Sequence, residues 1–186
     1  MIWTALAIIQ MIIIICFVII IKHLYKKAHT DMLTDLYTRR YFYKKMAELK
    51  RKRPVFLILI DIDNFKDVND IYGHPVGDQV LKQFARILKS NTRDSDLVVR
   101  WGGEEFAVVL FRTDVREAVK ISNRIKSTVE NFSFSCENVT CKITVSMGIA
   151  STKKQEELEL EQFIKIADEA LYKAKEKKNC IICSEC

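Results

Sequence analysis

The hydrophobic pattern divides the chain into two unlike parts. Residues 1–21, MIWTALAIIQMIIIICFVIII, contain no charged side chain, and every Lys, Arg, Asp and Glu follows them. A helix of this length measures about 31 Å, which matches the roughly 30 Å hydrocarbon core of a bilayer. The basic cluster KHLYKK follows at once, and such a cluster is typical of the cytoplasmic side of a span. The pattern predicts a single-pass transmembrane helix over residues 1–21, with the rest of the chain in the cytoplasm.

The alternative interpretation of residues 1–21 is a secretory signal peptide. No basic residues precede the apolar run, no small-residue cleavage site follows it, and the run is longer than the apolar region of a signal peptide. We expect residues 22–33 to continue the helix as a juxtamembrane linker. Its residues Leu24, Ala28 and Met32 form a narrow stripe suited to pairing with a partner helix. Residues 34–186 then form one domain.

Beyond residue 33 the apolar positions change between helical and strand spacing. The run VFLILI after Pro54 is uninterrupted and rich in β-branched residues, which indicates a strand buried on both faces. Gly102 and Gly103 between two apolar runs predict a hairpin turn, since both are free to take positive φ. The expected helices are 39–52, 64–72, 76–89, 114–131 and 156–178, and the expected strands are 55–63, 96–101, 104–111, 141–151 and 180–183. This order predicts an α+β fold, in which helices pack on a mixed or antiparallel sheet.

Composition and charge change this picture only a little. The chain has 186 residues, 49% of them hydrophobic, which predicts one domain with a core and an appendage. The net charge of +6 lies after residue 21. Its basic residues are scattered and form no aromatic-basic platform, so nucleic acid is not an expected partner. Lysines beside a span also favour an anionic lipid leaflet.

Six cysteines raise the question of disulfides and metals. A cytoplasmic location predicts reduced thiols. The alternative is a metal site in the tail CIICSEC (180–186), whose two CxxC spacings share Cys183.

Four acidic residues stand where predicted strands end or begin. Asp61 and Asp63 are two apart at the end of strand 55–63, so both point to one face. Glu104 and Glu105 are adjacent, so strand alternation lets only one of them face Asp61 unless the turn distorts the strand. Clustered carboxylates raise one another's pKa, and a divalent cation such as Mg²⁺ removes that conflict. The alternative is a set of solvated or helix-capping acids, which for Asp63 alone is the favoured interpretation.

RWGGEEF (100–106) resembles the signature of the GGDEF family, the bacterial diguanylate cyclases, in the variant with Glu at the third signature position. Four other segments resemble further parts of the family in the same order: DMLTDLYTRR (31–40), LILIDIDNFKDVNDIYGHPVGDQVL (57–81), ITVSMGIA (143–150) and ADEALYKAK (167–175). The resemblance implies a fold like that of nucleotidyl cyclases and polymerase palms, with a central sheet flanked by helices. It also implies condensation of two GTP molecules to cyclic di-GMP with release of pyrophosphate.

The resemblance gives roles to the acidic residues. Asp61 and Glu104, with the Ile62 carbonyl, would hold two Mg²⁺ ions per active site, with Mn²⁺ as an alternative, and Glu104 is the candidate base for the ribose 3′-hydroxyl. Two-metal sites clamp the attacking and leaving oxygens of an in-line displacement, and phosphoryl transfer depends mainly on positioning and charge neutralisation. Asp63 and Glu105 would be supporting residues.

Other positions match the family's nucleotide contacts. Asn69 and Asp78 match the pair that reads the guanine edge, a task that suits an amide and a carboxylate; helix capping is the alternative. The remaining expected substrate contacts are Phe65, Lys66, Gly102, Gly103, Lys175 and Lys178, and the further supporting residues are His74 and Arg100. Without the resemblance, Phe65 fits core packing, His74 a structural histidine and Lys175 a solvated charge. The glycines would let the nucleotide approach the backbone closely.

Arg93 and Asp96 match the family's RxxD motif for product inhibition, in which Arg offers a fork for phosphate or guanine. The sequence also departs from the family. Asp35 and Thr38 stand where Gly and Asn are usual, and EKKN (176–179) is one residue shorter than the family's segment and lacks its Gly and Arg. Lys178 would replace that Arg as a point charge.

Together these features predict a diguanylate cyclase in the bacterial inner membrane, with lipid contacts through residues 1–21. It would act as a homodimer, because two GTP sites must face each other for mutual 3′-attack. The alternative is a catalytically weak module that binds GTP or cyclic di-GMP as a receptor, and a degenerate signature would favour it. A nucleic-acid protein on a palm-like fold is a third interpretation, which the scattered charge does not support.

Overall fold

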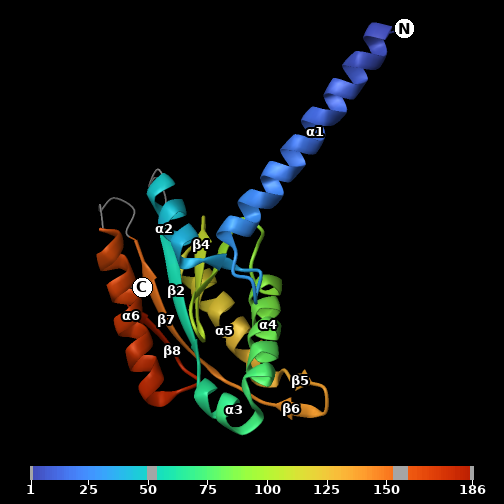
Figure 1. Cartoon of the computed structure of the whole chain (residues 1–186). Coiled ribbons are helices and arrows are strands. Elements are labelled where there is room, and N and C mark those ends of the chain that lie inside the picture. The colour runs from blue at the N-terminus through green and yellow to red at the C-terminus, as the bar shows by residue number, and fades with distance from the viewer. Residues whose placement is uncertain (1, 50–53, 153–158, 185–186) are drawn as a thin grey trace.

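The computed structural model describes residues 2–49, 54–152 and 159–184, and its centre is a six-stranded mixed sheet (Figure 1). The sheet has the order β1-β3-β4-β2-β7-β8. Its strands are β1 (Tyr37–Thr38), β2 (Val55–Ile62), β3 (Leu97–Gly102), β4 (Glu105–Phe111), β7 (Val145–Ser151) and β8 (Ile181–Ser184). The outer pairs β1–β3 and β7–β8 are parallel, whereas the inner pairs are antiparallel. The expected mixed sheet flanked by helices is confirmed.

Strand alternation divides the core between two faces of this sheet. On one face, α4 (His74–Ser90) and α5 (Val115–Asn131) cover side chains such as Ile58 and Ile60. On the other face, α2 (Arg39–Glu48) and α6 (Leu160–Lys177) cover Leu57 and Leu59. Strand β2 is buried along its whole length, as its uninterrupted apolar run predicts. Its end therefore delivers polar side chains into a largely covered edge of the sheet.

Three short strands were not expected from the sequence. Strand β1 has two residues, and β5 (Phe134–Cys136) and β6 (Val139–Cys141) form a separate hairpin that packs against α4. Helix α3 (Phe65–Tyr72) follows β2 directly and leads through Gly73, at φ 83°, into α4. Parts of two expected helices, 50–52 and 156–158, lie outside the described residues.

Helix α1 (Ile2–His29) projects away from the domain (Figure 1). It ends at His29, so the linker helix expected to reach residue 33 is four residues shorter. Its last turns contact α2: the rings of His29 and Tyr41 meet edge to face at 5.2 Å, and Lys44 Nζ donates a hydrogen bond to Tyr25 Oη at 3.1 Å. No helix within residues 2–49, 54–152 and 159–184 is both long enough and apolar enough to cross a membrane, so the span expected over residues 1–21 is not supported.

The cysteines differ in part from the expectation. Cys16, Cys136, Cys141 and Cys180 are free thiols. Cys183 is disulfide-bonded, so the prediction of reduced thiols is wrong at this position. Cys186, part of the alternative metal site, lies outside the described residues.

Candidate active site

The signature hairpin between β3 and β4 differs in detail from its prediction. Gly102 pairs with Glu105 across the hairpin, so the turn consists of Gly103 and Glu104 rather than of the two glycines. Neither glycine has a positive φ. The prediction that both glycines make the turn by taking positive φ is therefore wrong. A Cβ placed on Gly103 would meet no atom within 4 Å. Gly103 therefore borders open space, where a ligand has room to approach.

The register of β2 and β4 decides which glutamate lies opposite Asp61. Asp61 is the cross-strand partner of Glu105, and directly opposed residues project to the same face of a sheet. Glu104 lies in the turn, where its carbonyl accepts a hydrogen bond from the Ile62 amide at 3.4 Å. The prediction that alternation lets only one glutamate face Asp61 is confirmed for the strand, and that residue is Glu105 rather than Glu104. Alternation places Glu105 on the face of Asp61, and the turn, which alternation does not govern, brings Glu104 near it as well.

Asp61 is the most strongly perturbed carboxylate of this edge. The residue is 5% exposed, and Lys175 Nζ on α6 contacts its Oδ2 at 2.6 Å. Burial raises the pKa of Asp61, the hydrogen bond and charge of Lys175 lower it, and the charges of Glu104 and Glu105 raise it again, with a net rise. Burial lowers the pKa of Lys175, but the contact with Asp61 and the charge of both glutamates outweigh burial and raise it. Lys175 is therefore paired in the site rather than a solvated charge.

Asp63, two residues further, has a structural environment. It accepts hydrogen bonds from Thr144 Oγ1 at 2.6 Å and Ser146 Oγ at 2.7 Å on the β7 side, and from the Asn179 amide at 2.9 Å. Asp63 is 7% exposed, so the interpretation as a solvated acid is wrong. It fastens the end of β2 to β7 and to the turn before β8. No prediction from the sequence named Thr144, Ser146 or Asn179, although polar residues at alternate positions of a buried strand were a usable signal.

The donor set at this edge fits a hard divalent cation. The available ligands are all oxygen atoms: the carboxylates of Asp61 and Glu104 and the backbone carbonyl of Ile62. Mg²⁺ commonly uses one or two carboxylates together with substrate phosphates. Within the described ranges, no group of three or more His, Cys, Asp and Glu side chains is placed to hold a metal by itself. Asp61, Glu104 and the Ile62 carbonyl therefore fit the protein's share of such a Mg²⁺ site.

Helices α3 and α4 bring the expected guanine-reading residues together. A Cβ at Gly77 would collide with the side-chain oxygen of Asn69 and would lie 3.2 Å from the Phe65 ring. Gly77 thus allows Asn69 to lie directly against α4, where the next residue, Asp78, is exposed. Phe65 is 7% exposed and belongs to the core. Two further expected residues, Lys66 and His74, are exposed, and Gly77 was missed by the sequence analysis.

The shortened segment after α6 still delivers a lysine to the loop before α3. Lys178 Nζ donates to Asn64 Oδ1 at 2.6 Å. Lys178 adopts φ 54° and ψ 161°, a backbone conformation that is rare outside glycine. The neighbouring amide of Asn179 is held by Asp63. These contacts stabilise the unusual turn and place the Lys178 ammonium beside the β2–α3 loop.

Arg100 connects the segment after α1 to the signature turn. Its Nη1 lies 2.9 Å from Asp31 Oδ1, and its Nε and Nη2 donate to the Gly103 carbonyl at 3.2 and 2.9 Å. Asp31 also accepts from the amide and hydroxyl of Thr34, at 2.9 and 2.7 Å. Burial alone would raise the pKa of Asp31, but hydrogen bonds from Thr34 and Arg100 outweigh it and lower the pKa below 3.8.

We expect this contact to make unfolding pH-dependent. Because the pKa of Asp31 is lower in the folded state, its stabilisation is complete above the ordinary value of 3.8 and is lost as the pH falls through the lower, folded-state pKa. Urea unfolding of the full chain in detergent should show a loss of about 1 kcal/mol over this window that Asp31→Asn lacks. Equal acid sensitivity in wild type and Asp31→Asn would contradict the assignment.

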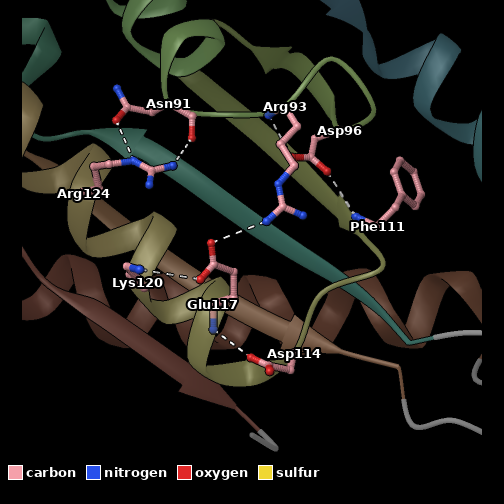
Figure 2. A network of polar contacts seen from close by, with 8 residues as sticks. All are labelled: Asn91, Arg93, Asp96, Phe111, Asp114, Glu117, Lys120 and Arg124. Carbon is pink, nitrogen blue, oxygen red and sulfur yellow. Dashed lines mark hydrogen bonds and ion pairs between the residues drawn. The ribbon is translucent and has the colours of Figure 1, made fainter.

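The expected product-binding residues Arg93 and Asp96 lie in the loop between α4 and β3, and the Arg93 side chain points toward Glu117 of α5 (Figure 2). The Arg93 amide donates to Asp96 Oδ2 at 3.0 Å, and Asp96 Oδ1 accepts from the Phe111 amide at 3.3 Å. The Arg93 guanidinium lies 3.6 Å from the Glu117 carboxylate and its side chain is 56% exposed. Asp96 therefore shapes the turn, whereas Arg93 is presented to solvent beside an acid that the sequence analysis missed.

The fold and this edge combine a mixed sheet flanked by helices with carboxylates at the end of a central strand, beside a glycine-containing turn and basic side chains. Residues 28–180 match the family described as "Diguanylate cyclase, GGDEF domain". The chain belongs to this family.

Individual relatives agree with the family match. The response regulator PleD of Caulobacter vibrioides is 38% identical over 162 residues, which make up 83% of this chain and 36% of PleD. The solved coiled coil and GGDEF domain of DgcB from Caulobacter crescentus, in complex with c-di-GMP, has a TM-score of 0.83 at 25% identity, over 94% of this chain and 95% of that chain. The active GGEEF domain of a diguanylate cyclase from Vibrio cholerae has a TM-score of 0.71 at 33% identity, over 78% of this chain and 96% of that chain. The chain spans only 25% to 42% of the length of several curated relatives.

Proposed function

We propose that this protein is a diguanylate cyclase that condenses two GTP molecules to cyclic di-GMP and pyrophosphate. The observation that carries the proposal is the buried Asp61 carboxylate, opposite Glu105 and near Glu104, beside the open space at Gly103. A buried carboxylate next to two others is costly unless a cation accompanies it, and Lys175 is that cation until a metal ion replaces it. Bound Mg²⁺–GTP would supply that metal ion and the phosphates together. The family match and the GGEEF-bearing relative support this assignment.

Each residue of the proposed site has a task. Asp61, Glu104 and the Ile62 carbonyl would hold the metal ions, which neutralise phosphate charge and activate the 3′-oxygen. Glu104 would accept the 3′-hydroxyl proton, and Glu105 would balance charge on the face of Asp61. At the guanine edge the Asp78 carboxylate would accept hydrogen bonds, and the Asn69 amide would both donate and accept them.

The phosphates would be bound by basic side chains around the β2–α3 loop. Lys66, Lys175 and Lys178 would neutralise their charge, and Gly102 and Gly103 would leave space for the nucleotide. His74 would keep a structural role at the start of α4. Arg100 would act as a positioning residue, since it holds the turn carbonyl of Gly103 and not a substrate atom.

Two copies are needed because each GTP 3′-oxygen attacks the α-phosphate of the other GTP. We propose a homodimer in which two sites face each other, with the projecting α1 as its pairing element. Leu24, Tyr25 and Met32 are exposed at or just beyond the end of that helix. The solved structure of the coiled coil and GGDEF domain of DgcB supports this arrangement.

Attachment to the bacterial inner membrane through residues 1–21 remains a proposal. It rests on the exposed apolar side chains of α1, which include Trp3 at 84% and Ile13 at 62%. Recovery of the chain in the membrane pellet after washing with alkaline carbonate would support it. Release by that wash would overturn it.

The experiment for the catalytic proposal is a product analysis of the full chain. Detergent-solubilised protein with GTP and Mg²⁺ should form cyclic di-GMP and pyrophosphate, separated by chromatography, at a rate that rises faster than linearly with protein concentration. Binding of GTP or cyclic di-GMP without any product would favour the receptor interpretation. Neither binding nor product would contradict both.

Product feedback through Arg93 and Asp96 leads to a prediction about Glu117. The Glu117 carboxylate competes with a product phosphate or guanine for the Arg93 guanidinium (Figure 2). We expect Glu117→Gln to lower the cyclic di-GMP concentration for half-inhibition about threefold, because a partly exposed ion pair contributes up to about 1 kcal/mol. Arg93→Ala should abolish inhibition. The measurement is initial rate against added product.

Lys120→Gln serves as the control, since Lys120 also contacts Glu117, at 4.0 Å, but lies outside the RxxD motif. An unchanged half-inhibition concentration in both Arg93→Ala and Glu117→Gln would rule out feedback at this place.

A further inference from the structure

One cation already lies in the candidate active site. Lys175 Nζ is 2.6 Å from Asp61 Oδ2, a carboxylate oxygen of a residue that is 5% exposed. The Lys175 side chain itself is 44% exposed. It comes from the last turn of α6, so a lysine from the far end of the chain closes the end of β2.

This contact answers the electrostatic problem of the acidic edge. Asp61 has Glu105 directly across the sheet and Glu104 in the adjacent turn. A buried carboxylate in that company needs a nearby positive charge to stay ionised. Lys175 supplies the charge when no other cation is present.

The same carboxylate is the proposed metal ligand, and the same lysine is a proposed phosphate contact. The Lys175 ammonium and a metal ion would compete for the same group, the Asp61 carboxylate. A nucleotide phosphate offers the ammonium another anionic partner. The four-carbon stem and high exposure of Lys175 let it exchange partners by rotation of the side chain alone.

We infer that Lys175 is an exchangeable internal counter-ion, which holds Asp61 in the empty site and transfers to the nucleotide phosphates when the metal ion is bound. This inference rests on the proposed function. Metal and nucleotide then strengthen each other's binding. The nucleotide phosphates draw Lys175 away from Asp61, which frees the metal ligand, and the metal ion on Asp61 frees Lys175 to bind the phosphates. Such coupling is reciprocal: the factor by which nucleotide tightens metal binding equals the factor by which metal tightens nucleotide binding.

The coupling factor between metal and nucleotide distinguishes a lysine that moves from Asp61 to the phosphates from a lysine that only repels the metal ion. A lysine that only repels the metal weakens its binding with or without nucleotide, and its removal leaves the coupling factor unchanged. A lysine that leaves Asp61 for the phosphates weakens metal binding mainly in the nucleotide-free protein. Its removal therefore lowers the coupling factor.

The test is Mn²⁺ binding to the full chain in detergent, measured from the electron paramagnetic resonance signal of free Mn²⁺. Titrations are made with and without a GTP analogue that has a methylene group between its α- and β-phosphorus atoms. In wild type we expect the analogue to tighten Mn²⁺ binding at least about tenfold, within the usual range of coupling between sites. In Lys175→Met, nucleotide-free binding should tighten and the analogue's effect should fall by at least about threefold, while the phosphates that ligate the metal directly maintain the remainder.

Lys165→Met is the matched control, because Lys165 lies on the same helix but pairs with Glu169 at 3.9 Å. Lys175→Gln repeats the test in case Lys175→Met does not fold, as judged by circular dichroism. An unchanged coupling factor in Lys175→Met or Lys175→Gln overturns the inference. Absence of Mn²⁺ binding in wild type with the analogue would instead contradict the proposed metal site, so the two failures are distinguishable.

Discussion

Asp61→Asn is expected to lower the rate of cyclic di-GMP formation at least about a thousandfold, because it removes the carboxylate charge proposed to hold the metal ions. Asn keeps the size of the side chain and one oxygen, so packing at the end of β2 should not change. The measurement is the steady-state rate of product formation with Mg²⁺ well above the metal requirement of wild type. Glu104→Gln should show a loss of similar size, whereas Glu105→Gln should lose less.

The stability of Asp61→Asn separates a catalytic defect from a folding defect. Because the pKa of Asp61 is raised above 3.8 in the folded state, its ionisation weakens folding as the pH rises through the window above 3.8. Asn has no such dependence, so the variant should be at least as stable as wild type at neutral pH. Asp70→Asn, at an exposed position of α3, is the control. Full activity in Asp61→Asn, or a similar loss in Asp70→Asn, would contradict the proposed role.

Gly148→Ala is expected to destabilise the domain by about 3 kcal/mol, near the upper end for overpacking a core. A Cβ on Gly148 would collide with backbone atoms of α6, the carbonyl of Ala167 and the amide of Leu171. A backbone obstacle cannot rotate away as a side chain can. The clash is therefore relieved only if α6 moves away from β7. Such a movement would also shift Lys175, which lies on α6.

Urea unfolding of the full chain, monitored by circular dichroism, measures this effect. Gly103→Ala is the matched control, because a Cβ there would meet no atom within 4 Å, and its change in stability should be below about 0.5 kcal/mol. A loss below about 1 kcal/mol in Gly148→Ala would show that α6 and β7 tolerate more separation than the structure indicates.

The signature hairpin shows where reasoning from sequence succeeds and where it stops. The apolar runs on either side of Gly102 and Gly103 predicted a strand pair and its place beside Asp61, and the register confirms both. The turn position was wrong by one residue, because a two-residue turn is chosen by the cross-strand pairing and not by where the glycines stand. Because of this shift of one residue, Glu105 lies on the strand opposite Asp61 and Glu104 lies in the turn.

The polar contacts around the site were least predictable. Lys175 and Lys178 are far from Asp61 and Asn64 in sequence, and their pairing depends on how α6 lies on the sheet. The same is true of Glu117 beside Arg93. Charged residues on exposed helix faces carry no periodic signal that names a partner.

Sequence alone determined the buried strand β2, most helix boundaries, the acidic end of β2 and the motifs that identify the family, because these follow from local patterns of side chains. Only the tertiary structure decided that Glu105 opposes Asp61, that Asp63 accepts three hydrogen bonds, and that Lys175 pairs with Asp61. The reason is physical. A local pattern fixes which face a side chain occupies, whereas the register of strands and the close approach of α6 at Gly148 fix which side chains meet.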